Sequence, residues 1–138
     1  MAFPRLSPIP VTWDIVTPQN GTNITADTTQ IVWKAPRACE VIDAGFAWHE
    51  TAITASKTNY AAIYIYNAGA AGTGTSAIAT YNNYNTAIAA GGLVSPTLVT
   101  TYAALDADDY VSVKLDIQET LAIGRIHGQF NVVYGDSK

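Results

Sequence analysis

Apolar and polar residues alternate with a period of two along most of this chain. In residues 110–117 (YVSVKLDI) every second side chain is a large apolar one: Val111, Val113, Leu115 and Ile117. Strict alternation of this kind indicates a β-strand with one buried and one exposed face. The same period, with many β-branched and aromatic residues, predicts further strands at 11–16, 29–35, 39–48, 60–66, 76–81 and 127–134.

Turn-forming residues separate these segments. Clusters such as KAPRA (34–38) and LDADD (105–109) lie between predicted strands. Short strands divided by such clusters are typical of an all-β sandwich or barrel. Residues 82–105 are rich in alanine and threonine, and their pattern leaves three structures open: a short helical turn, a long loop and one more strand.

The first residues differ from the rest because prolines stand at positions 4, 8 and 10. Proline has no backbone N–H and cannot pair as a central strand. We therefore expect residues 1–12 to form an extended arm and residues 13–138 to form one β-sandwich domain. The start, MAFPRLSPIP, has neither the basic nor the apolar region of a secretory signal, so we expect the chain to be made and folded in the cytoplasm.

Composition narrows the classes of function. Charged residues make up only 13% of the 138 residues, and the formal net charge is −4. The seven basic residues are scattered from Arg5 to Lys138, whereas nucleic-acid binding requires clustered lysine and arginine. No apolar run is long enough to span a membrane. We therefore expect neither a nucleic-acid partner nor a membrane partner.

Reactive side chains form no recognisable catalytic pattern. Cys39 is the only cysteine, which excludes an intrachain disulfide, and its apolar surroundings predict a small buried side chain. His49 and His127 stand at strand ends and have too few companions for a metal site. The cluster DADD (106–109) favours a polar turn, with calcium binding as the alternative. We predict no catalytic residue, no metal and no cofactor. The only support for a hydrolase is the presence of carboxylates, whose positions relative to one another the sequence does not give.

The stretch YIYNAGAAGTGTSAIATY (64–81) contains glycines spaced as in some phosphate-binding turns. A nucleotide site of that type would need a helix after the glycines, or a lysine. No lysine follows, and asparagines at 82, 83 and 85 disfavour a helix. Period-two alternation continues on both sides, so we predict a β-hairpin with a glycine-rich loop.

Aromatic residues divide between core and surface in this prediction. Trp33 and Phe46 are expected in the sandwich core. Tyr64 and Tyr66 share the polar face of their strand, which makes them candidates for an interface or ligand surface, because tyrosine buries a large area and keeps a polar tip.

Taken together, three segments resemble the head decoration (cement) proteins of bacteriophages. They are IVWKAPRACEVIDAGFAWHE (31–50), AAIYIYNAGAAGTGTSAIATY (61–81) and LDADDYVSVKLDIQETLAIGRIHGQFNVVYGD (105–136). The resemblance covers roughly residues 30–136 and lies in the pattern and order of strands. In the family pattern a glycine stands where this chain has Asp108.

The resemblance implies a jelly-roll-like antiparallel β-sandwich and a non-enzymatic role on the virion exterior. It implies a homotrimer that binds the major capsid protein and stabilises the expanded head lattice. Candidate capsid or subunit contacts are then Phe3, Pro4, Arg5, Leu6, Pro8, Pro10, Trp13, Tyr64 and Tyr66. The alternative is a carbohydrate- or receptor-binding jelly-roll module of a phage fibre.

Overall fold

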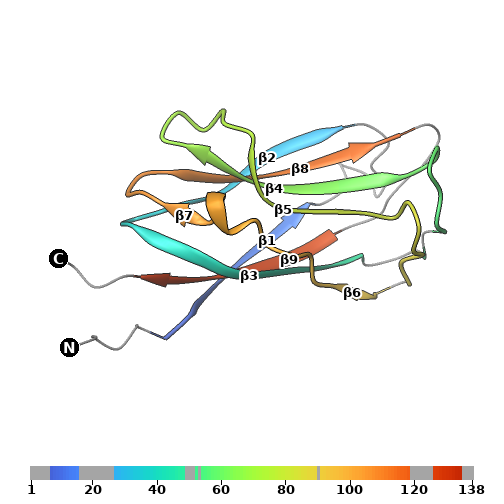
Figure 1. Ribbon diagram of the computed structural model, residues 1–138, viewed down its shortest axis with the longest axis horizontal. Helices are drawn as coiled ribbons and strands as arrows, with labels where there is room; N and C mark the ends of the chain where they lie inside the picture. Colours follow the sequence, from blue (N-terminus) through green and yellow to red (C-terminus); the bar gives the residue numbers. More distant parts are fainter. Residues whose placement is uncertain are drawn as a thin grey trace.

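The computed structural model describes residues 7–15, 27–48, 52, 54–89, 91–118 and 126–134 of the 138-residue chain. Two antiparallel sheets lie face to face (Figure 1). The strands are β1 (Ile9–Ile15), β2 (Thr28–Lys34), β3 (Cys39–Trp48), β4 (Ala61–Gly69), β5 (Ser76–Asn82), β6 (Leu93–Val94), β7 (Ala104–Leu105), β8 (Tyr110–Ile117) and β9 (Ile126–Tyr134), with one 3-10 turn at Thr100–Tyr102.

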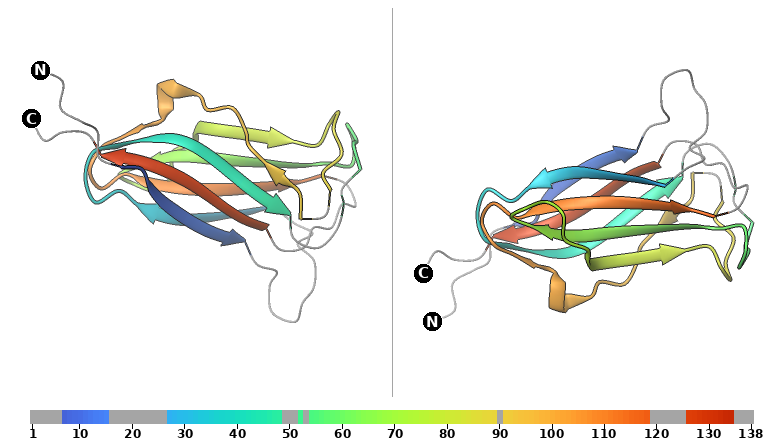
Figure 2. Two further views of the ribbon diagram at one scale, coloured as in Figure 1. Left: turned by 90° about the horizontal axis from the view of Figure 1, so that it is seen from below. Right: turned by 90° about the horizontal axis from the view of Figure 1, so that it is seen from above.

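The order of strands is that of a jelly roll. One sheet runs β1-β9-β3-β6, with β7 also paired to β3, and the other runs β2-β8-β4-β5. Successive long strands cross between the sheets except at β4 and β5, which form a hairpin. Figure 2 shows the sheet with β1, β9 and β3 in front on the left and the sheet with β2, β8, β4 and β5 in front on the right. The expectation of a jelly-roll-like β-sandwich is confirmed.

The core fills the space between the sheets because each strand points its apolar alternation inward. All four apolar positions predicted in β8 are buried. Two edge-on aromatic pairs bridge the layers, each with ring centroids 5.7 Å apart: Trp33 with Phe130, and Phe46 with Tyr81. Phe46 belongs to the buried core as predicted, whereas Trp33 is partly buried and packs against that core.

Trp13 packs against a glycine on the neighbouring strand. β1 pairs Trp13 with Gly128 of β9, and a Cβ at position 128 would lie 1.9 Å from the Trp13 ring. Only a residue without a side chain therefore fits beneath the indole. Trp13 is 5% exposed, so its place among the candidate contact residues was wrong: the alternation of β1 turns it into the core.

A buried asparagine joins the loop before β4 to the end of β5. Asn83 is fully buried; its Oδ1 accepts from Ala61 N at 2.8 Å, and its Nδ2 donates to the Thr54 carbonyl at 2.8 Å. Both polar ends of the amide are thus satisfied, as burial requires.

Most predicted strands agree with the structure to within a few residues at each end. The glycine-rich stretch forms the β4–β5 hairpin as predicted, and its turn uses positive φ angles at Gly69 and Gly72. The ambiguous segment 82–105 holds β6, the 3-10 turn and β7.

The boundary of the arm requires a correction. β1 begins at Ile9 and includes Pro10, so residues 9–12 lie in the sandwich and not in the arm. Pro10 is accommodated because β1 is an edge strand that pairs only with β9. Residues 1–6 of the predicted arm lie outside the described residues.

The edges of the two sheets are protected unequally. Pro10 interrupts the edge formed by β1, while the segment after β6 lies along β5 through the bridge Ala79–Leu98. β2 has no proline, and Ile31 on this strand is 52% exposed. Its one described link to β1 is a side-chain contact from Gln30 Nε2 to the Asp14 carbonyl at 3.4 Å.

Gly128→Ala should destabilise the fold by about 1–3 kcal/mol, because the new methyl group overpacks the space that the Trp13 ring occupies. Denaturant unfolding measured by tryptophan fluorescence gives the free energy. The matched control is Gly45→Ala in β3, where a Cβ meets its nearest atom at an ordinary 3.4 Å. Equal effects at the two positions would contradict the assignment.

Candidate functional site

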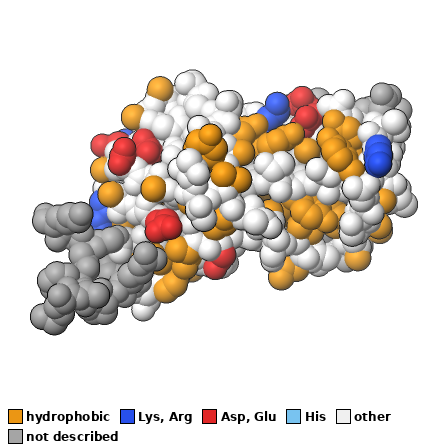
Figure 3. Space-filling model, viewed as in Figure 1, with side chains coloured by type: hydrophobic (Ala, Val, Ile, Leu, Met, Phe, Trp, Pro, Cys, Tyr) orange, Lys and Arg blue, Asp and Glu red, His pale blue; other side chains and the backbone are white. Residues whose placement is uncertain are grey.

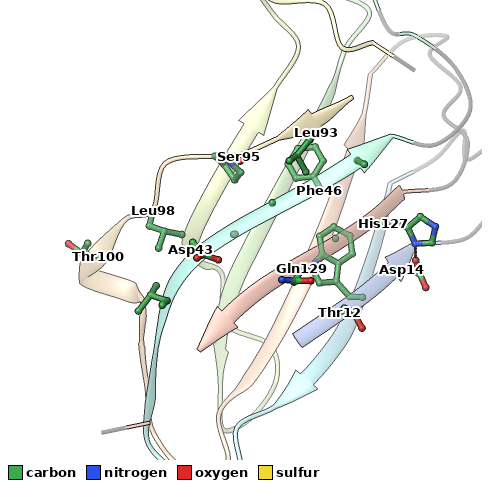
Figure 4. A pocket seen from close by; sticks show the side chains of 17 residues that line it. Thr12, Asp14, Asp43, Phe46, Leu93, Ser95, Leu98, Thr100, His127 and Gln129 are labelled. Carbon is green, nitrogen blue, oxygen red and sulfur yellow. Dashed lines mark ion pairs between the residues drawn. The ribbon is translucent and has the colours of Figure 1, made fainter. Parts of the chain in front are cut away.

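A groove crosses the outer face of the five-stranded sheet (Figure 4). Its volume is about 940 Å³. The floor comes from outward positions of β1, β9 and β3, where Gly45 and Ala47 leave space because their side chains are absent or short. The wall is the segment from β6 to the 3-10 turn, with the lining side chains Leu93, Ser95, Pro96, Leu98 and Thr100.

Polar side chains of the groove form two hydrogen-bonded groups. Asp14 on β1 forms an ion pair with His127 on β9 (Figure 4). Asn131 Nδ2 donates to Asp43 Oδ1 at 2.5 Å, and Gln129 Nε2 contacts Asn131 Oδ1 at 3.4 Å. The described lining includes Asp14 and Asp43 but neither lysine nor arginine. The groove therefore favours a ligand that brings positive charge.

An apolar side chain stands at the rim of the same groove. Leu93 is 77% exposed, the highest fraction among the large hydrophobic residues that the structure describes. Leu98 and Pro96 further along the wall are half-buried. The groove thus combines carboxylates with an apolar wall, a combination suited to a segment with both basic and apolar side chains.

A second surface lies on the outer face of β4, β8 and β5. Tyr64 and Tyr66 stack there with ring centroids 5.6 Å apart, and Tyr60 meets Tyr84 edge-on at 4.4 Å. Burial raises the pKa of Tyr64 above its usual range, and the hydrogen bond with Tyr84 raises the pKa of Tyr60 to about 12. The raised pKa values keep Tyr60 and Tyr64 neutral at physiological pH.

The predicted contact residues do not form one surface. Tyr64 and Tyr66 do share an outer face, but Tyr66 is only 9% exposed. Pro8 and Pro10 lie exposed on the other sheet, at the start of β1. Phe3, Pro4, Arg5 and Leu6 fall outside the described residues.

The acidic cluster at 106–109 uses its carboxylates within a turn. Asp109 Oδ2 accepts from Asp106 N at 2.9 Å, and Asp108 adopts φ 72° and forms an ion pair with Lys34 at 3.2 Å. Asp108 thus takes the left-handed conformation that a glycine would adopt easily. Over the described ranges, no three or more His, Cys, Asp or Glu side chains gather as metal ligands would.

Sequence reasoning missed the groove. Asp14, Asp43 and Gln129 occupy the polar positions of three predicted strands, so their outward direction followed from the alternation. Their proximity depends on β9 lying between β1 and β3, which alternation cannot show. The exposed Leu93 gave no signal, because its segment had no assigned structure.

Comparison with solved structures shows a likeness of fold. The fold is similar to a chain of "Capsid of Ralstonia phage GP4", with a TM-score of 0.61 and 13% sequence identity. The superposition covers 99% of this chain and 90% of that chain. No protein-family model and no curated protein matches the sequence. The likeness therefore establishes a shared fold over almost the whole length.

In the part of the chain that the structure describes, no helix has the length and hydropathy to cross a lipid bilayer.

The thiol of Cys39 should be inert in the folded protein. Cys39 is 7% exposed, and burial raises its pKa to about 11. At pH 8 the neutral thiol is therefore the dominant form, and the thiolate is the reactive species. We expect no labelling by a maleimide at pH 8 over minutes and full labelling in guanidinium chloride, measured by mass spectrometry. Rapid labelling without denaturant would contradict the burial.

Proposed function

We propose that this protein is a non-enzymatic structural protein of a bacteriophage virion, a trimeric decoration protein on the outside of the head. The observation that carries the proposal is the jelly-roll fold shared with the phage GP4 capsid chain over 99% of this chain. The resemblance of residues 30–136 to decoration proteins points the same way. Neither argument depends on a catalytic motif.

The mechanism of such a protein is mechanical. A decoration protein binds across the boundaries between capsid subunits, and its binding free energy adds to the stability of the assembled lattice. When it binds only the expanded form of the lattice, mass action shifts the equilibrium toward that form. Stabilisation of the expanded lattice in this way requires complementary surfaces and no chemical step.

The surface of this chain suits close packing against proteins. Hydrophobic side chains are spread over the face seen in Figure 3, and charged ones are sparse among its described residues. The tyrosines of the four-stranded sheet present rings with polar tips, a composition enriched at interfaces. Tyr64 is the candidate contact on this face, since it is more exposed than Tyr66.

The proposal is tested with heads of the phage that encodes the protein. We expect the purified chain to bind expanded heads, to leave unexpanded heads undecorated, and to raise the temperature at which expanded heads release DNA. Tyr64→Ser should weaken binding about tenfold or more, as loss of a central aromatic contact does. Co-sedimentation with heads measures occupancy.

Asp106→Asn serves as the control, because this exposed side chain lies on the turn before β8 and away from the tyrosines. Failure of the unaltered protein to bind heads of either form would overturn the proposal. Equal losses for Tyr64→Ser and Asp106→Asn would remove the tyrosine face from the interface.

The second candidate is a carbohydrate-binding module of a fibre. The groove favours it, because carboxylate, amide and hydroxyl groups from Asp43, Gln129 and Thr12 line a concave surface. A glycan array probed with and without calcium separates the two candidates. Specific glycan binding together with absence of head binding would favour the fibre module.

A further inference from the structure

We propose that the groove on the five-stranded sheet is the docking site for residues 1–6 of a second copy of this chain. The inference deepens the proposed function, since it supplies the contact between subunits of the proposed trimer. It requires nothing of the capsid.

Charge is complementary between the two partners. The described lining of the groove carries Asp14 and Asp43 without lysine or arginine. Residues 1–6 (MAFPRL) contain Arg5 and no acidic residue. Asp43 accepts one described hydrogen bond, through Oδ1, and a carboxylate has acceptor positions for a guanidinium as well.

Shape and hydrophobicity also match. Gly45 and Ala47 leave a depression beside the wall, and Leu93 stands over it with its side chain 77% exposed. A Cβ at Gly45 would lie 3.8 Å from Leu93 Cδ1, so Leu93 borders the floor directly and offers its exposed apolar side chain to a segment lying beside it. The remaining side chains of the arm are predominantly apolar: Met1, Ala2, Phe3, Pro4 and Leu6.

The length of residues 1–6 fits the distance between Asp14 and Asp43. Along β9, His127 stands beside Asp14 and Asn131 stands beside Asp43. Those four residues correspond to ~14 Å at about 3.4 Å per residue, and β1 and β3 lie on either side of β9, about 10 Å apart, which gives a span of ~17 Å. Six residues with proline, in the extended polyproline conformation of about 3.1 Å per residue, span ~19 Å. The arm is therefore long enough to contact both acidic positions.

Chain direction favours a neighbouring copy as the donor. β1 enters its sheet at Ile9, opposite Val132, and then runs along the groove toward Asp14. The arm could reach its own groove only by reversing direction at Ser7–Pro8. Residues before proline avoid the helical region, and both Ser7 and Ile9 precede prolines. The described residues 7–9 are thus biased to stay extended, which favours a groove on a neighbouring copy.

Such a contact is heterologous, because an arm on one copy meets a groove on the next. Heterologous contacts close into rings when the rotation between copies permits. A ring of three copies would place each arm in one groove and leave no groove vacant. Docking of each arm in the groove of the next copy would therefore close a trimer through heterologous contacts alone.

Charge reversal in the full-length chain tests the contact. We expect the unaltered chain to sediment as a trimer, and Arg5→Asp or Asp43→Arg alone to raise the concentration needed for assembly about tenfold or more. The double variant should recover much of the loss, because the charge pair is restored with reversed polarity. Asp106→Arg changes the same charge outside the groove and should have no effect.

A crosslink identifies which copy donates the arm. A tagged chain with Leu6→Cys is mixed with an untagged chain with Ala47→Cys, and a disulfide heterodimer of intermediate mass is expected on a non-reducing gel. Ala70→Cys, on the exposed turn of the β4–β5 hairpin, replaces Ala47→Cys as the control. A chain that carries both Leu6→Cys and Ala47→Cys reports on docking within one copy.

Several results would overturn the inference. A chain that is monomeric in solution, a trimer indifferent to both charge reversals, equal crosslinking to Ala47→Cys and Ala70→Cys, or a purely intrachain disulfide in the chain with both cysteines would each do so. Binding to expanded heads is measured separately. Head binding by a chain whose oligomeric state does not respond to these variants would refute the inference and leave the decoration role in place.

Discussion

The contact between the Trp13 ring and the backbone of Gly128 fixes the register of the edge strand that carries half of the polar groove. Among the described strands β1 is paired with β9 alone, and a slip of one residue would turn Trp13 toward solvent and its polar neighbours inward. With Trp13 seated on Gly128, Asp14 falls beside His127 and Thr12 beside Gln129. One glycine therefore determines both how the core closes at this edge and which side chains meet on the outer surface.

Period-two alternation predicted the strands well because burial on one face selects apolar residues at every second position. It worked for β8 and β3 and for the hairpin at 64–81, where the absence of a lysine and the later asparagines excluded a nucleotide site. It was weaker at Pro10, since proline is excluded from central strands but tolerated at an edge. Which strands would become edges is a property of the topology, and no local pattern contains it.

The difference between local alternation and sheet topology also explains which site residues could be predicted from the sequence. The outward direction of Tyr64 and of Asp43 could be inferred from their own strands. Their surroundings could not: Tyr66 is only 9% exposed, and Asp43 meets Asn131 only because β3 pairs with β9. Trp13 was misplaced because the prolines before it suggested that the arm reached further than it does. Polar groups brought together by topology need the folded structure to be recognised.

The uneven protection of the sheet edges has a consequence for how this protein behaves at high local concentration. Open strand edges recruit further strands, and unlimited growth requires two of them on each molecule. Here proline interrupts β1 and a following segment covers β5, so β2 is left as the long unprotected edge among the described strands. Two molecules that paired through β2 would each have this edge covered by the other. The pair would then have no long open edge among its described strands with which to add a third molecule. Pairing through β2 would therefore stop at two molecules and would not continue into a fibre.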